Sequence, residues 1–189
     1  MRTAVSHSVK RHFMLGLVLA CCMGPLQSAT LERLSLDDMI AKSTAIVRGR
    51  VGSSYAQQHG LVIFTHYKVQ VLERWKGPVA TEVDVAVPGG TLGGKTQTVA
   101  GSPALAAGDE LVFFLWTGKS GVTQVMGLSQ GALALETDSS GQQYVTRAPS
   151  SESMVNPAGQ KVRDAGVRMQ LGDFRSRVAR TMAAGGGVK

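Results

Sequence analysis

Cysteine is almost missing from this chain, and both copies, Cys21 and Cys22, fall within its first 29 residues. If that segment is removed, no disulfide can form, and the rest of the chain must rely on its hydrophobic core. Histidine is also scarce, since only His59 and His66 lie beyond residue 29. They could approach each other across a hairpin, but two histidines without a third ligand make a poor metal site. We therefore predict no metal-binding residues and no cofactor.

A concentrated positive charge is lacking as well. Without the first 29 residues, 17 Lys and Arg residues face 13 Asp and Glu residues, a net charge of +4. The basic residues are scattered, except for five arginines between Arg163 and Arg180. A nucleic-acid binder would gather its basic residues on one face, with aromatic residues between them. The sequence therefore predicts no nucleic-acid partner.

The first 29 residues have the three parts of a signal peptide. A basic start, an apolar core and a small-residue exit occupy residues 2–11, Phe13–Met23 and Pro25–Ala29. The core is too short to span a bilayer, so we expect export to the periplasm or the extracellular space, with cleavage after Ala29. An alternative is lipidation, because Val18–Cys21 resembles a bacterial lipobox and would attach a lipid to Cys21. A membrane anchor is predicted only if Cys21 is lipidated.

The region from Ala45 to Gly90 carries the clearest structural pattern, because apolar residues fall on every second position. Three stretches alternate in this way, at Ala45–Val51, Thr65–Trp75 and Thr81–Val87. This period is typical of strands with one buried and one exposed face. A polar loop is predicted at Gly52–Gly60, between the first two strands.

Further strands follow. Leu111–Trp116 is apolar on both faces, which indicates a strand buried in a barrel or sandwich. Thr123–Glu136 and Gln143–Arg147 read as two more strands. Both tryptophans, Trp75 and Trp116, are expected to pack in the core or at its end.

Helices are predicted at both ends of the mature chain. Ser35 and Asp38 form a capping box at the start of a short helix. Beyond Ser150 the β pattern stops, and a C-terminal amphipathic helix is expected to cover an open end of the sheet structure. Its apolar stripe contains Met169, Phe174, Val178 and Met182. The alternative role for this helix is binding to a membrane surface or a partner.

Two short motifs imitate enzyme signatures. Gly89–Thr96 has the letters of a phosphate-binding loop, but β-branched residues and then Gly101 follow it, so no helix is available to bind phosphate. We interpret it as a glycine-rich turn and predict no nucleotide. Gly127–Gly131 has the letters of a nucleophile elbow around Ser129, yet no histidine follows Ser129. The order His66, Asp84, Ser129 leaves a serine hydrolase open as an alternative, whereas a bend in a strand is the simpler interpretation.

Taken together, several stretches resemble a group of small, uncharacterised exported bacterial proteins. The resemblance covers roughly Ala45 to Glu136 and rests on the sequences AIVRGRV, FTHYKVQVLERWKG, VDVAVPGG, GDELVFFL and VMGLSQG. Their shared pattern is GxV, TxxxVxV, KG, VPGG, GDExVxFL and GxxQG. The resemblance implies a small closed OB-like β-barrel, and it carries over no catalytic residue.

We therefore expect a mainly β protein, built as a single small antiparallel β-barrel with a short N-terminal helix and a C-terminal amphipathic helix. The expected segments are a signal peptide at 1–29, the barrel domain at 30–149, and a linker, helix and flexible tail at 150–189. The predicted function is non-enzymatic binding of a protein or envelope component, as an accessory to or inhibitor of an exported protein. The candidate surface is Gly52–Gly60 with Gly89–Gly101. Alternatives are a serine hydrolase using Ser129 with His66, and a glycan- or small-molecule-binding barrel.

Overall fold

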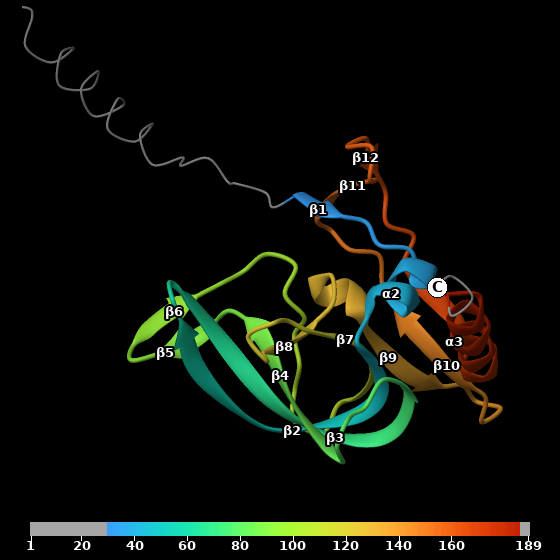
Figure 1. The fold of residues 1–189 in the computed structure, drawn as a ribbon, viewed down its shortest axis with the longest axis horizontal. Coiled ribbons are helices and arrows are strands. Elements are labelled where there is room, and N and C mark those ends of the chain that lie inside the picture. The colour runs from blue at the N-terminus through green and yellow to red at the C-terminus, as the bar shows by residue number, and fades with distance from the viewer. Residues whose placement is uncertain (1–29, 186–189) are drawn as a thin grey trace, which may run out of the picture.

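The computed structural model describes residues 30–185 as a mainly β structure with two α-helices (Figure 1). The N-terminal elements are β1 (Thr30–Glu32), α2 (Leu36–Lys42), β2 (Ala45–His59), β3 (Val62–Lys76), β4 (Glu82–Pro88), β5 (Gly90–Leu92) and β6 (Lys95–Gln97). The later elements are β7 (Glu110–Thr117), β8 (Thr123–Val125), the 3₁₀ helix η2 (Leu128–Gly131), β9 (Ala132–Thr137), β10 (Gln143–Arg147), β11 (Ser153–Val155), β12 (Lys161–Val162), β13 (Val167–Gln170) and α3 (Leu171–Gly185).

One large sheet organises these elements. Its strand order is β13-β10-β9-β7-β2-β3-β4-β8, and β8 pairs with β7 as well as with β4. On one side of β8, Gln124 lies opposite Ala86 of β4; on the other side it lies opposite Trp116 of β7. The path from β7 through β2, β3, β4 and β8 therefore returns to β7.

Strand β7 separates two hydrophobic cores. Val112 and Phe114 belong to a core that α2 and α3 cover, whereas Phe113 and Leu115 belong to a core among β2, β3, β4 and β8. All four side chains are fully buried. The prediction that Leu111–Trp116 is buried on both faces is confirmed up to its last residue. Trp116 is 46% exposed, so of its two predicted places the core is wrong and the end of the core remains a prediction.

The N-terminal helix has the predicted capping box. The Ser35 hydroxyl accepts the N–H of Asp38 at 3.0 Å, and the Asp38 carboxylate accepts the N–H of Ser35 at 3.3 Å. At the other end of α2, the Lys76 ammonium donates to the carbonyls of Ile40 and Ala41 at 2.6 and 2.8 Å. A cation at this end is favourable because the last carbonyls of a helix lack partners within it.

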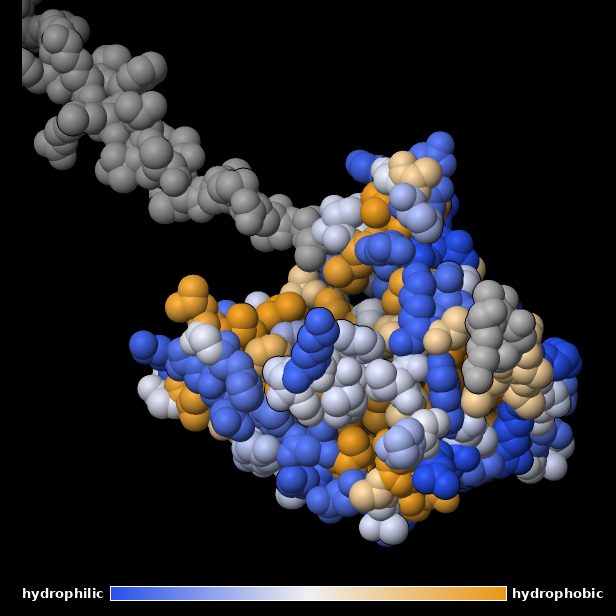
Figure 2. Space-filling model, in the orientation of Figure 1, coloured by the Kyte–Doolittle hydropathy of each residue, from blue (hydrophilic) through white to orange (hydrophobic). Residues whose placement is uncertain are grey.

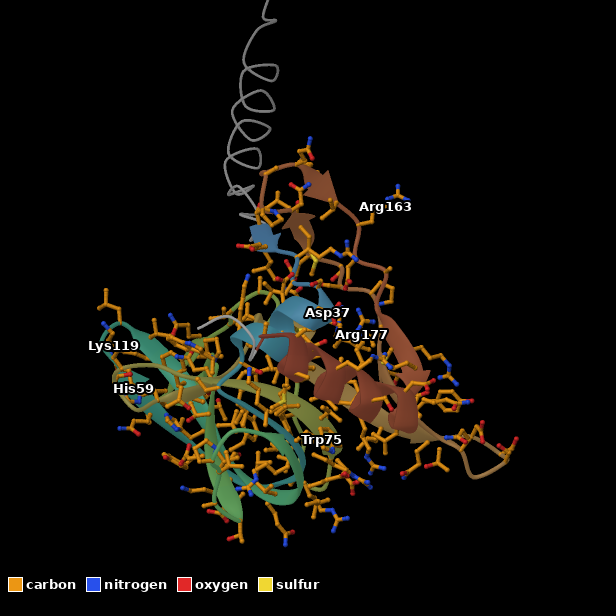
Figure 3. All side chains as sticks on the ribbon, turned by 45° about the vertical axis from the view of Figure 1, so that its right-hand side comes forward. Asp37, His59, Trp75, Lys119, Arg163 and Arg177 are labelled. Atoms are coloured by element: carbon orange, nitrogen blue, oxygen red, sulfur yellow. The ribbon has the colours of Figure 1, made fainter. Side chains whose placement is uncertain are left out.

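The C-terminal helix is also present, and it packs on the protein. Of the four residues in its predicted apolar stripe, Phe174 and Val178 are buried. Met182 is 39% exposed, and Met169 belongs to β13. Arg177 of α3 donates two hydrogen bonds to Asp37 of α2, at 2.8 and 2.9 Å. Figure 3 shows these two side chains pointing toward each other between the helices.

Two predicted boundaries are wrong. Residues 52–59 are not a loop, because β2 continues to His59 and pairs with β3 as far as Val62. The residues look like a loop because this half of the hairpin is largely exposed and lacks regular apolar alternation. Thr123–Glu136 is not one strand either, since η2 interrupts it between β8 and β9.

The β structure also extends past Ser150, contrary to prediction. Strand β13 pairs with β10, and β11 pairs in parallel with β1 at the start of the described chain. The predicted signal peptide with Cys21, and residues 186–189 of the predicted tail, lie outside the described residues. Within residues 30–185, no helix is both long and apolar enough to cross a membrane.

Candidate functional site

Gly89–Gly101, one of the two segments predicted as a binding surface, is bonded to β3, the strand that pairs with the other segment. The Gly89 N–H donates to the Ile63 carbonyl at 2.7 Å, and the Ile63 N–H donates to the Gln97 side chain at 2.7 Å. The Thr65 hydroxyl donates to the Gly89 carbonyl at 2.8 Å. The β5–β6 hairpin is therefore bonded to the distal half of β3. We call residues 52–66 together with 89–101 the distal lobe.

The glycine-rich letters in this lobe make a turn, as predicted. β5 and β6 pair antiparallel around Gly93 and Gly94, so the exit of the phosphate-loop pattern is a strand and not a helix. Gly90 is needed for close packing, because a Cβ added there would lie 2.4 Å from the Thr65 hydroxyl. It also has a φ of +139°, which side chains rarely tolerate.

The distal lobe exposes apolar side chains. Leu61, at the turn between β2 and β3, is 92% exposed, and Leu92 in β5 is 36% exposed. Figure 2 shows hydrophobic residues reaching the surface at the end of the molecule where Figure 1 places β5 and β6. Isolated exposed leucines are common, whereas two on one braced projection make it a candidate interaction surface.

A polar cluster lies on the same strands, centred on Asp84 of β4. Its carboxylate bonds His66 Nδ1 at 2.7 Å, the Lys68 ammonium at 2.7 Å and the Tyr55 hydroxyl at 2.8 Å. Burial by itself would raise the pKa of Asp84, but the hydrogen bonds from Lys68, His66 and Tyr55 outweigh it and hold the pKa below its usual value. Asp84 is therefore a carboxylate that fixes three side chains.

His66 is the most enclosed member of this cluster. Its side chain is 9% exposed, and its ring stacks on Tyr55 with centroids 4.8 Å apart. The ring of His59 lies 5.6 Å from it, so the two histidines do approach each other across the hairpin. Nε2 of His66 is buried and has no hydrogen-bond partner among the described residues. Within residues 30–185, no group of three or more His, Cys, Asp and Glu side chains is placed to hold a metal ion.

The histidine and aspartate of the hydrolase alternative are in contact, but Ser129 is elsewhere. Ser129 is the second residue of η2, and its N–H donates to the Gly101 carbonyl at 2.9 Å. It lines a cleft with Arg147, Ser150 and Glu152, and His66 is not among the lining residues. No hydrogen bond in the described part of the chain joins Ser129 to His66. The bend predicted at this motif is present as η2.

Gln130 gives the GxxQG turn a structural role that the sequence alone did not indicate. Its side chain accepts the Leu34 N–H at 2.9 Å and donates to the Glu32 carbonyl at 3.0 Å. The residue is 1% exposed. A buried glutamine with both ends of its amide paired to one backbone segment holds that segment in place. Gln130 thus holds the segment between β1 and α2 against η2.

We expect Gln130→Ala to lower the free energy of unfolding by about 1–3 kcal/mol, because it removes a buried side chain and leaves the part-buried Leu34 N–H and Glu32 carbonyl without their partner. Amide hydrogen exchange at residues 30–34 should accelerate, because the substitution releases this segment first. Gln142→Ala is the matched control, since Gln142 is exposed. Equal stability of the two variants would contradict the anchoring role of Gln130.

Comparison with known proteins adds no relative to this description. No family model matches the chain, and no curated protein and no solved structure matches it.

Proposed function

We propose that this protein is an exported, non-enzymatic binding module, and that its sheet is a small OB-like barrel. Support for the barrel comes from β8, which pairs with β4 on one side and with β7 on the other. OB-like barrels bind their ligands on one sheet face and its flanking loops. In this chain the corresponding projection is the distal lobe.

The observation that carries the proposal is Leu61, which is 92% exposed at the end of a hairpin braced by β5. A leucine at a rigid tip loses little conformational freedom on binding and can insert into an apolar pocket of a partner. The partner that fits this chemistry is an exported protein, which the module would assist or inhibit.

A crosslinking experiment tests the proposal. The full chain is expressed with a C-terminal tag, crosslinked in its native envelope fraction, and the captured proteins are identified by mass spectrometry. One dominant protein is expected with the wild type. Leu61→Asp combined with Leu92→Asp should reduce its capture at least about tenfold, because charged residues are depleted at the centre of protein interfaces.

Leu72→Asp is the matched control, because Leu72 is 41% exposed on β3 outside the distal lobe. Equal capture by the lobe variant and this control would remove the surface assignment. Capture of no protein by a folded wild type would favour the second candidate function, glycan or small-molecule binding. One observation supports that candidate: the half-exposed Trp116 borders an apolar groove with Val125, Met126 and Leu128.

A further inference from the structure

His66 is held in an arrangement that metal-binding histidines commonly have. Its Nδ1 lies 2.7 Å from the carboxylate of Asp84. A carboxylate paired with one ring nitrogen of a histidine fixes the ring and its tautomer, and it makes the other nitrogen a better ligand. When Asp84 accepts the proton on Nδ1, the lone pair of Nε2 is left free. The ring is held further by stacking on Tyr55 at 4.8 Å.

The free nitrogen has no other use in the described structure. The His66 side chain is only 9% exposed. Its Nε2 is buried and has no hydrogen-bond partner among the described residues. Buried polar atoms of this kind are rare and call for an explanation, such as an ion. The two nitrogens lie on opposite sides of the imidazole, so Nε2 points away from Asp84.

His59 supplies a second imidazole close to the first. The two ring centroids are 5.6 Å apart, with the planes tilted by 41°. In the square-planar geometry typical of Cu²⁺, two neighbouring imidazoles with metal–nitrogen bonds of about 2.0–2.1 Å have centroids roughly 4.5 Å apart. His59 is exposed near the end of β2, where Figure 3 shows it, and its ring touches Phe64 edge-on at 5.6 Å. A shared ion therefore requires the His59 ring to move closer and to turn a nitrogen toward Nε2 of His66, and the exposure of His59 leaves its side chain room to do so.

We propose that His59 and His66 form a two-histidine site for Cu²⁺, with water completing the coordination. Imidazole is a ligand for copper and zinc, and Cu²⁺ binds a given set of nitrogen ligands most tightly among the divalent ions of the first transition row. A site with only two protein ligands therefore favours Cu²⁺ over Zn²⁺ or Ni²⁺. Both histidines lie in the distal lobe, but the copper site is argued without any partner of that lobe, and its test needs none.

Titration with Cu²⁺ alone tests the site. The full chain is expressed, the folded protein is recovered, and binding is followed by calorimetry and by electron paramagnetic resonance. We expect one equivalent of Cu²⁺ with hyperfine coupling to two imidazole nitrogens. His59→Ala should weaken this binding at least about tenfold and remove one nitrogen coupling. Asp84→Asn should weaken it by about 10–100-fold, the usual effect of losing the carboxylate behind a histidine ligand.

Gln70→Ala is the matched control, because Gln70 is exposed on the same strand, β3, and makes no hydrogen bond with the Asp84 carboxylate. It should change the affinity by less than about threefold. Copper bound elsewhere, for example at Cys21 or Cys22, is common to all variants and leaves their differences unchanged. Unaltered affinity and unaltered nitrogen coupling in His59→Ala would overturn the proposal, and so would a wild type that binds no copper.

Discussion

Asp164→Ala is expected to lower the free energy of unfolding by about 3–5 kcal/mol, the range seen when one partner of a buried ion pair is removed. Both terminal nitrogens of Arg147 donate to the Asp164 carboxylate. The two side chains are only 10% and 3% exposed. The carboxylate also accepts the N–H of Ser150 at 2.7 Å and that of Gly166 at 3.2 Å. Its removal leaves a buried guanidinium and two backbone donors without their acceptor.

Chemical denaturation measures this loss, and the exposed pair Asp37–Arg177 provides the control. The side chains of that pair are 53% and 36% exposed. Asp37→Ala should therefore cost no more than about 1 kcal/mol, because surface ion pairs contribute little. The buried-pair interpretation would be wrong if the two aspartate variants lost equal stability.

The buried Arg147–Asp164 pair also makes the stability of the protein depend on pH. The hydrogen bonds from Arg147 lower the pKa of Asp164 from 3.8 to about 2, against the opposing effect of burial. A carboxyl whose folded pKa lies below its unfolded pKa stabilises the protein above the unfolded value, and that contribution is lost as pH falls through the folded value. The shift corresponds to about 2 kcal/mol, which should be present at pH 6 and disappear between about pH 5 and pH 2. In Asp164→Ala this component of the acid dependence should be absent.

Local patterns were sufficient to predict the parts of the fold that depend on neighbouring residues. The capping box at Ser35 is visible in four consecutive positions, and the alternation of Val83, Val85 and Val87 marks the inner face of β4. Val85 and Val87 are buried and Val83 packs against the same core, as that alternation predicts. Such features require only the strand or helix period and no knowledge of what the element packs against.

Features that depend on distant pairing were missed. Three-residue strands such as β1 and β11 are too short to show a period, and they exist because Thr30–Glu32 meets Ser153–Val155 across the fold. The distal half of β2 has no such period either, since its pairing with β3 is what makes it a strand.

The candidate site was predictable in part. His66, Lys68 and Asp84 all fall on the polar face of their strands, so their meeting follows from alternation. The position of Tyr55 does not follow from alternation. Tyr55 lies four residues after the inward-facing Val51, so a regular strand would point both side chains to the same face. An irregularity between Val51 and Ser54 adds one residue to β2, and this shift sets Tyr55 opposite His66. A bulge of this kind has no sequence signature here, so the stacking of Tyr55 on His66 had to come from the structure.

A second large effect is expected at Phe174, whose ring joins α3 to the sheet. Phe174 is fully buried and meets two other aromatic rings edge-on: Trp75 at 5.3 Å and Phe114 at 5.9 Å between centroids. Phe174→Ala should lower the free energy of unfolding by about 3–5 kcal/mol, because it removes a large apolar side chain and leaves a cavity between helix and sheet. Denaturant unfolding measures the change, followed by tryptophan fluorescence in a Trp116→Phe background, where Trp75 beside the substituted ring is the only tryptophan.

Met182→Ala separates the role of this ring from that of the helix as a whole. Met182 lies on the same helix but is 39% exposed, so its truncation should cost well under about 1 kcal/mol. If α3 adds nothing to the stability of the sheet, Phe174→Ala will accelerate amide hydrogen exchange in α3 while the denaturant midpoint of global unfolding stays unchanged. We expect the midpoint to fall, because Phe174 shares one core with Met39 and Ile40 of α2 and with Phe114 of β7. Loss of that ring therefore weakens both helices and the central strand together.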